Sequence, residues 1–273
     1  MKYDDFLKSI TENGDTTDRI FFNTFGVKKE KICKNVIISP GWNPERVFDM
    51  DKAEEIVSYS PLFGFKVWNI SFADLTITYV RTGHGAPMVL DAVLMLGMTE
   101  CKNILFLSSI GALSEKIKVG DIIIPEYAVC GDGASRYIGS GKDLSDMFGE
   151  KVYPNKDAIK SLSRITESCC KKNDVVWHYG KTFCADTIMA QYGYIKNIID
   201  MGCNSIDMET AAVFRAAELT GVSAAAIMLV SDNTVLNKSL LSGKIDEKEK
   251  LYRRYVRGTI IPEIVKNYFG EML

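Results

Sequence analysis

Short apolar segments of strand length alternate with helical patterns along most of this chain, and this alternation limits the folds open to it. The strand-like segments are residues 36–39, 75–80, 103–108, 121–124 and 224–230. Helical spacing is found at residues 87–96, 157–172 and 207–220. Strands interleaved with helices are typical of an α/β fold with a largely parallel or mixed sheet.

Glycine and proline suggest where several of these elements end. We expect Gly97 to end the helix over 87–96 in a left-handed cap. Pro125 is expected to close the strand over 121–124, because proline cannot donate a ladder hydrogen bond. The tail over 247–269 is expected to be a covering helix interrupted near Pro262.

Length and composition favour a globular protein that acts on a small molecule. A chain of 273 residues with 47% hydrophobic and 25% charged residues can form one large α/β domain. Its net charge of −2 and scattered cations argue against a nucleic-acid or membrane partner. No apolar run reaches spanning length and the N-terminus lacks a signal-peptide core, so we expect a cytoplasmic protein.

The cysteines and histidines give no sign of a metal centre. Seven cysteines, an odd number, occur without a C-x-x-C pair, and the chain has two histidines. We therefore predict neither a disulfide framework nor a metal site. Cys184 lies beside candidate site residues, but we expect it to pack as a small hydrophobic side chain without a chemical role.

Loops that follow several predicted strands carry glycine or polar residues. In open α/β sheets, ligands bind outside the carboxyl ends of the strands, so we expect one crevice at which several loops converge, those at Gly41, Gly83, Ser109 and Asp232. Taken alone, an aspartate after a strand is more often a helix cap or an ion-pair partner than a catalytic group. Whether Asp232 has a catalytic or a structural role therefore has to be inferred from the neighbouring motifs.

Seven ordered motifs between about residues 35 and 235 resemble the nucleoside phosphorylase family of uridine phosphorylases, hexameric purine nucleoside phosphorylases and methylthioadenosine nucleosidases. They are ISPGWNPERV (38–47), TGHGAP (82–87), SIGAL (109–113), VGDII (119–123), DGAS (132–135), DMETAA (207–212) and VSD (230–232).

The resemblance implies a single-domain three-layer αβα fold over residues 1–273 with a central mixed, twisted sheet. Residues 1–34 would be an N-terminal extension and 236–273 a C-terminal helical segment. It also implies a homo-oligomer, either a dimer or a hexamer built as a trimer of dimers.

Glu209 is the candidate for holding the sugar. A carboxylate can accept hydrogen bonds from two adjacent ribose hydroxyls, and these bonds strengthen as positive charge develops on the sugar. The resemblance makes Glu209 the ribose-binding glutamate and places Met208 against the sugar. The alternative is a solvated glutamate in the first turn of a helix.

Asp232 is the candidate acid for the leaving base. A purine departs more easily when its imidazole ring is protonated, which requires an acid of raised pKa. Asp232 matches the purine enzymes of the family, whereas uridine phosphorylases generally lack this aspartate, so a purine nucleoside is favoured. The resemblance implies further base contacts from Phe183, Asp207 and Gly111. Core packing for Phe183 and a helix cap for Asp207 are the alternatives.

The motifs expected to bind phosphate are only partly present. Gly41, Arg46 and Ser109 match the phosphate loop, arginine and hydroxyl of the family, with one extra residue before Pro44. Two further family arginines align with Asn69 and Phe106. Charge-assisted hydrogen bonds contribute roughly 1.5 to 3 kcal/mol each, so their loss weakens phosphate binding unless other cations compensate. The candidates considered are Arg81, Arg136, Lys116 and Lys118.

Three functions stay open from the sequence. The first is a phosphorylase that needs no cofactor and uses inorganic phosphate as co-substrate, giving free base and ribose-1-phosphate. The second is a nucleosidase that uses water, for which Glu45 is a weak candidate base. The third is a noncatalytic nucleoside-binding protein. Dinucleotide binding is not favoured, because Gly83-His84-Gly85 lacks the full glycine fingerprint.

Overall fold

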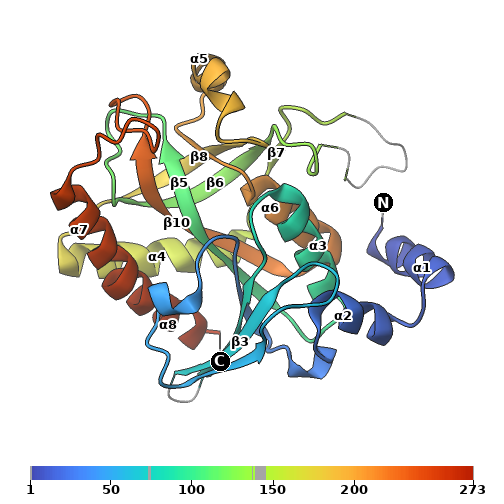
Figure 1. Cartoon of the computed structure of the whole chain (residues 1–273). Coiled ribbons are helices and arrows are strands. Elements are labelled where there is room, and N and C mark those ends of the chain that lie inside the picture. The colour runs from blue at the N-terminus through green and yellow to red at the C-terminus, as the bar shows by residue number, and fades with distance from the viewer. Residues whose placement is uncertain (1, 73–74, 137, 139–145, 273) are drawn as a thin grey trace.

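The computed structural model describes residues 2–72, 75–136, 138 and 146–272. Within them, ten strands form one mixed sheet (Figure 1). The strands are β1 Asn35–Ser39, β2 Ala53–Val57, β3 Lys66–Phe72, β4 Leu75–Arg81, β5 Asn103–Ala112, β6 Ile122–Cys130, β7 Lys151–Val152, β8 Trp177–Cys184, β9 Ser205–Asp207 and β10 Ser223–Asn233.

The sheet curls back on itself at one end. Its strand order is β10-β6-β8-β9-β5-β1-β4-β3-β2, β7 pairs with β6, and a further pairing of β10 with β5 closes a ring. β5 runs parallel to β1 and β10, and its last residues pair with β9. The carboxyl ends of β5 and β10 therefore lie next to each other.

Successive side chains along a strand point to opposite faces of the sheet, and helices cover the apolar side chains on both faces. In β10, Ala226, Met228 and Val230 pack in one core with α3 Ala86–Leu96 and α6 Thr210–Thr220. The intervening Ile227 and Leu229 pack in a second core with α4 Lys156–Asn173 and α8 Ile261–Gly270. The predicted α/β fold, with a mixed central sheet between helical layers, is confirmed (Figure 1).

The N-terminal residues form two helices, α1 Tyr3–Asn13 and α2 Thr17–Phe25. The Tyr3 hydroxyl donates a hydrogen bond to the Leu94 carbonyl at 2.5 Å, which attaches α1 to the end of α3. The predicted left-handed cap at Gly97 is wrong, because its φ is −60°. A Cβ at Gly97 would lie 2.6 Å from the Tyr3 hydroxyl, so glycine is needed there for the close approach of Tyr3.

Two element boundaries also differ from the prediction. β6 continues through Pro125 to Cys130, and its register with β8 shifts between Pro125 and Tyr127. An irregularity of this kind lets a strand tolerate proline inside a sheet. The helix expected over 207–220 begins only at Thr210, because Asp207 ends strand β9.

The chain after β10 continues as α7 Glu247–Tyr255, a π-helical turn Val256–Ile260, and α8, which packs with α4 on one face of the sheet. This turn precedes Pro262, so the predicted interruption near that proline is present as a change of helix type. None of the helices in the described residues combines the length and apolar character needed to cross a membrane.

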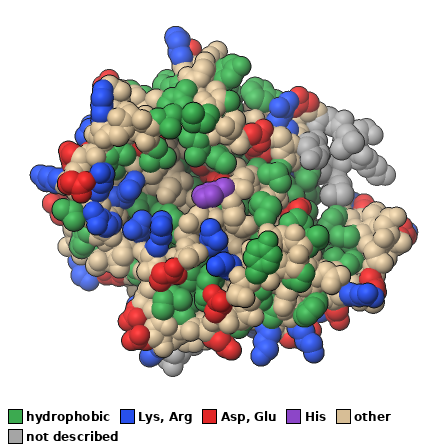
Figure 2. Space-filling model, in the orientation of Figure 1, with side chains coloured by type: hydrophobic (Ala, Val, Ile, Leu, Met, Phe, Trp, Pro, Cys, Tyr) green, Lys and Arg blue, Asp and Glu red, His purple; other side chains and the backbone are tan. Residues whose placement is uncertain are grey.

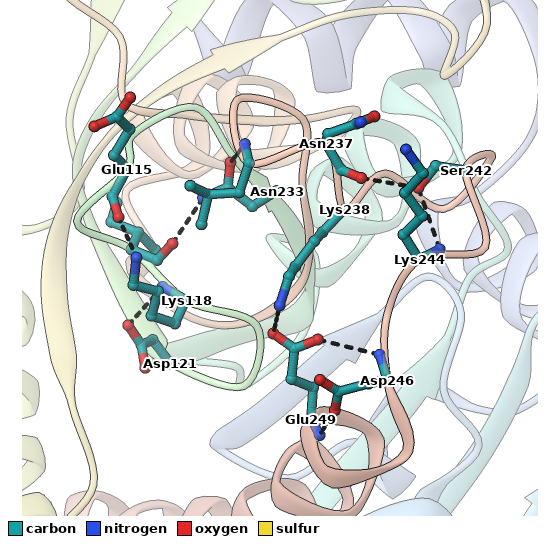
Figure 3. A network of polar contacts seen from close by, with 12 residues as sticks. Glu115, Lys118, Asp121, Asn233, Asn237, Lys238, Ser242, Lys244, Asp246 and Glu249 are labelled. Carbon is teal, nitrogen blue, oxygen red and sulfur yellow. Dashed lines mark hydrogen bonds and ion pairs between the residues drawn. The ribbon is translucent and has the colours of Figure 1, made fainter.

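Polar contacts hold the start of α7 (Figure 3). Asp246 and Glu249 form a capping box, in which each side chain accepts from the backbone N–H of the other residue. Lys238, in the loop after β10, forms an ion pair with Glu249. At the end of β10, the buried Asn233 amide donates to the carbonyls of Ser114 and Ile117 at 2.8 and 2.7 Å. The network fixes where α7 begins relative to β10.

Candidate active site

A cavity of about 330 Å³ opens at the carboxyl ends of β1, β5 and β10, in the place predicted from the strand ends. Its volume is at the lower end of the range for small-molecule sites. Most of the predicted site residues line it together: Gly41, Arg46, Ser109, Gly111, Asp207, Met208, Glu209 and Asp232. The cavity is therefore the candidate active site.

Glu209 lies between β9 and α6 and is only 4% exposed. The backbone N–H of Gly85 donates to its Oε1 at 2.8 Å, and Nδ1 of His84 lies 4.0 Å from the same oxygen. Gly85 has φ of 102°, which brings its N–H to the carboxylate in a conformation that side chains other than glycine rarely adopt. Burial, and then the charge of Asp207, raises the pKa of Glu209 to about 8.

Asp232 is placed by an irregularity in β10. The register with β5 shifts between Val230 and Asp232, and Asp232 then lies opposite Gly111. The Ser231 hydroxyl donates to Asp232 Oδ1 at 2.7 Å, while the Leu240 N–H approaches Oδ2 at 3.4 Å. Burial raises the pKa of Asp232, which is the direction required of an acid near neutral pH.

The carboxylate of Asp207 is occupied by its own surroundings. Its Oδ2 accepts from the backbone N–H of Thr210 at 2.9 Å and from the Thr210 hydroxyl, which holds the start of α6. The Cys184 thiol donates to Oδ1 at 2.8 Å. Burial, and then the charge of Asp207, raises the pKa of Cys184 well above its usual value, so the group stays a thiol. Asp207 lines the cavity and also caps the helix.

Phe183 does not line this cavity. It lines a neighbouring cavity of about 690 Å³ together with Phe148, Tyr194 and Met201. The centroids of the Phe183 and Phe148 rings are 6.3 Å apart. The two cavities share Gln191. The structure thus brings Phe183 close to the site without placing it among the residues around Asp232.

His84 belongs to the motif TGHGAP (82–87), and the sequence predicted no role for it. It lines the cavity between Glu209 and the loop at Gly41, and a Cβ at Gly41 would lie 2.5 Å from His84 Cε1. Burial, and then the charge of Arg81, lowers the pKa of His84. Its neutral imidazole can therefore both donate and accept hydrogen bonds.

The cations at the cavity differ from those considered as replacements. Its lining includes Arg253 in α7 and Arg257 in the π-helical turn, with Arg46. The sequence contained a signal for this pair: arginines four residues apart in a predicted helix lie on one face.

The replacements considered from the sequence lie elsewhere: Arg81, Arg136, Lys116 and Lys118 are absent from the described lining. Arg136 instead forms an ion pair with Asp146 at 2.5 Å. Glu45, the weak candidate for a water-activating base, also lies outside the lining and accepts from the Asn43 amide at 2.8 Å.

The two positions at which the resemblance implies arginines in the family are taken up by side chains with other contacts. Phe106 is fully buried in the core between the sheet and helices α3 and α6. The side chain of Asn69 accepts from the Thr78 hydroxyl at 2.8 Å and donates to the Lys31 carbonyl at 3.2 Å. Neither side chain lines the cavity.

The described residues contain no group of three or more His, Cys, Asp or Glu side chains arranged as metal ligands. The charged groups that line the cavity are three carboxyl groups and three guanidinium groups, those of Asp207, Glu209, Asp232, Arg46, Arg253 and Arg257. This combination suits a neutral sugar and base beside an anion.

The chain is similar to known proteins over most of its length. The sequence model described as the phosphorylase superfamily matches residues 42–255. A guanosine phosphorylase of Halorubrum lacusprofundi is 27% identical over 204 residues, which cover 74% of this chain and 79% of the relative. A DeoD-type purine nucleoside phosphorylase of Mycoplasma genitalium is 26% identical over 79% of this chain and 88% of its own.

Pyrimidine enzymes are also among the similar proteins. A uridine phosphorylase of Thermococcus kodakarensis is 24% identical and covers 78% of this chain and 77% of its own. The crystal structure of uridine phosphorylase from Vibrio fischeri ES114 has a TM-score of 0.68 at 22% identity, over 88% of this chain and 93% of that one.

Because the family match covers most of its length, the chain belongs to the phosphorylase superfamily. The predicted resemblance to nucleoside phosphorylases is confirmed by the family match and by the named relatives. The chain is therefore a member of a family of enzymes that are pentosyltransferases.

Proposed function

We propose that this protein is a nucleoside phosphorylase that cleaves purine nucleosides with inorganic phosphate, giving free base and ribose-1-phosphate. One observation carries the proposal: the buried carboxyl groups of Glu209 and Asp232 line the same cavity as Gly41, Arg46 and Ser109. A carboxylate that can bind the sugar, an acid that can protonate the base and hydrogen-bond donors for an anion thus line one cavity.

Glu209 binds the ribose in this proposal. Its Oε1 is held by the Gly85 N–H, and it lies beside Met208 in the cavity wall. Before the sugar binds, burial keeps Glu209 protonated near neutral pH. Hydrogen bonds donated by the sugar hydroxyls, and the positive charge that develops as the glycosidic bond breaks, favour its ionised form, which stabilises that charge. Met208 packs against the sugar.

Asp232 protonates the leaving purine. A phosphate oxygen forms a bond to the anomeric carbon while the bond from that carbon to the base nitrogen breaks. The electron pair of the broken bond goes to the base, and the Asp232 proton neutralises it at the imidazole ring. The raised pKa of Asp232 keeps this proton available closer to neutral pH.

The preference for purines is supported by Asp232 and by relatives named guanosine phosphorylase and purine nucleoside phosphorylase. Gly111, opposite Asp232, leaves room for the base, and Asp207 forms part of the same wall. Phe183 is proposed to contact the base from the neighbouring cavity. The chain needs no cofactor in this scheme, and we propose that it acts as a homo-oligomer, a dimer or a trimer of dimers.

Hydrolysis is the second candidate, because Asn69 and Phe106 stand where family arginines would bind phosphate. The deciding experiment incubates the protein with inosine, adenosine, guanosine, uridine and methylthioadenosine, with and without phosphate, and resolves the products. Base release that requires phosphate, together with ribose-1-phosphate, is the expected result. Release of base and free ribose at the same rate without phosphate would establish the nucleosidase. Nucleoside binding without turnover would refute both enzymatic functions and support a noncatalytic nucleoside-binding protein.

A further inference from the structure

We propose that Arg253 and Arg257, from the C-terminal helical segment, join Arg46 to form the phosphate-binding end of the cavity and replace the two arginines that the chain lacks. The inference rests on the proposed function, in which inorganic phosphate is the second substrate. It adds Arg253 and Arg257, which lie outside the seven motifs found in the sequence, the last of which ends at Asp232.

The three guanidinium groups lack acidic partners among the described residues. Arg46, Arg253 and Arg257 form no ion pair within 4.0 Å there, whereas Arg254, on the same helix, lies 3.9 Å from Glu247. The Nε atoms of Arg253 and Arg257 are buried and have no hydrogen-bond partner within the described part of the chain. Leaving a buried donor unsatisfied costs about 1 to 3 kcal/mol, so these groups suit a ligand that accepts hydrogen bonds.

The positive charges also act on one another. Burial lowers the pKa of Arg257, and the charges of Arg46 and Arg253 lower it further. Arg253 also acts on Asp232, whose pKa its charge lowers. Three cations beside this one carboxyl group favour the binding of an anion at this end of the cavity. On the face that bears α7, Figure 2 shows Lys and Arg side chains gathered beside that helix.

The positions of these arginines relative to the reacting groups suit a phosphate. The Arg257 guanidinium lies 5.6 Å from the centroid of the Trp42 ring, and Trp42 directly follows Gly41 of the predicted phosphate loop. Arg253 Nη1 donates to the Ser231 carbonyl at 2.9 Å, next to Asp232. The two arginines therefore approach the cavity from the phosphate loop on one side and from the acid on the other.

The helix that carries them is held in place by its own contacts. The capping box of Asp246 and Glu249, and the ion pair of Glu249 with Lys238, fix the first turn of α7 against the loop after β10 (Figure 3). Residues 253 and 257 are one turn apart, so both side chains leave the helix on the face toward the cavity.

The ligand class follows from the donors. Planar guanidinium groups bind phosphate oxygens through paired hydrogen bonds, and the Ser109 hydroxyl lines the same cavity. A free phosphate dianion and the phosphate of a nucleoside 5′-monophosphate share this chemistry. We assign free inorganic phosphate, because the cavity also contains the loop at Gly41.

The test measures the binding of inorganic phosphate to the intact protein by isothermal titration calorimetry. The variants are Arg257→Gln, Arg253→Gln and the charge-retaining Arg257→Lys, with Arg254→Gln as the matched control on the same helix. We expect each glutamine variant at 253 or 257 to weaken phosphate binding by about 10- to 100-fold, the loss of a charge-assisted bond. Arg257→Lys should lose less phosphate affinity than Arg257→Gln. The phosphate affinity of Arg254→Gln should stay within about twofold of that of the parent protein.

Kinetics then separates binding from a structural role. In the glutamine variants, KM for phosphate should rise while nucleoside affinity, measured without phosphate, is unchanged. Unchanged phosphate binding in both variants would overturn the inference, and so would absence of phosphate binding by the parent protein. Weaker binding of nucleoside 5′-monophosphate with unaltered binding of inorganic phosphate would also overturn it. Phosphate binding that requires Arg257 without any base release would support this site and refute the proposed activity.

Discussion

Asp232 lies directly opposite Gly111 across the parallel pair of β10 and β5, immediately after the shift in register at Ser231. A Cβ at Gly111 would lie 3.6 Å from Asp232 Oδ1 and 3.2 Å from Ile206 Cγ2. The first distance is an ordinary contact and the second is tight. The absence of a side chain at residue 111 thus determines how much space is left beside the proposed acid.

Gly111→Ala should therefore reduce catalysis more than stability. The added methyl group presses on Ile206 and fills space next to Asp232, and we expect kcat/KM for a purine nucleoside to fall on the order of tenfold. Gly193→Ala is the control, because a Cβ there meets nothing within 4 Å. Equal activity of both variants would show that the base does not occupy the space beside Gly111.

Asp232→Asn should slow the release of ordinary purines by about 10²- to 10⁴-fold, because the amide cannot supply the proton. Nucleoside affinity should change little. 7-Methylguanosine tests the reason, since its base already carries a positive charge and departs without an acid. Its cleavage by the variant should stay close to that by the parent protein. An equal loss for both substrates would mean that Asp232 acts by positioning the substrate.

Glu209→Gln should alter how stability depends on pH. An unfolded glutamate ionises near pH 4.5, whereas the buried Glu209 keeps its proton up to about pH 8. Because this pKa is raised in the folded state, its contribution to stability is present below pH 4.5 and is lost as the pH rises to about 8. The parent protein should thus lose stability relative to Glu209→Gln between pH 5 and 8, measured by urea unfolding. A difference that does not vary with pH would contradict the raised pKa.

Gly41→Ala tests the contact between the loop and His84. The new methyl group would lie 2.5 Å from His84 Cε1, so the imidazole must move. The His84 side chain is 67% exposed and can do so, and we expect a small effect on stability and a higher KM for phosphate. Adding His84→Ala removes the clash. The double variant should bind phosphate more tightly than Gly41→Ala alone, and equal binding would show that the methyl group itself blocks the site.

Asp246→Ala tests whether the cap of α7 supports the arginines. Loss of an N-cap costs about 1 kcal/mol of stability. Fraying of α7 should also raise KM for phosphate, because Arg253 lies in this helix. Asn155→Ala is the matched control: Asn155 caps α4 by accepting from the N–H groups of Asp157 and Ala158, away from the cavity. Both variants should lose similar stability, measured by thermal unfolding, and only Asp246→Ala should change KM.

The parts of the fold that depend on local pattern could be predicted from the sequence. The alternation of apolar strands with helices predicted the layered α/β architecture, and the helix expected to run to residue 220 does end at Thr220. Contacts between distant residues could not be read in this way. Gly97 is required by Tyr3, and the passage of β6 through Pro125 depends on its register with β8.

The site shows the same division. The sequence motifs predicted the site residues that lie at the ends of strands or the start of a helix, namely Gly41, Ser109, Glu209 and Asp232. Phe183 faces a neighbouring cavity because β8 turns its side chain toward Phe148. The arginines of the C-terminal segment had no motif, and only the path of the chain after β10 shows that they return to the cavity.

The π-helical turn and α7 place the proposed anion-binding cations on an outer helix instead of a core strand. An arginine at the position of Phe106 would have to be accommodated within packed apolar side chains, whereas the partly exposed Arg253 and Arg257 can change without opening a hole in the core. Evolution can therefore alter which nucleophile this protein accepts through substitutions in one surface segment, while the groups that hold sugar and base stay as they are.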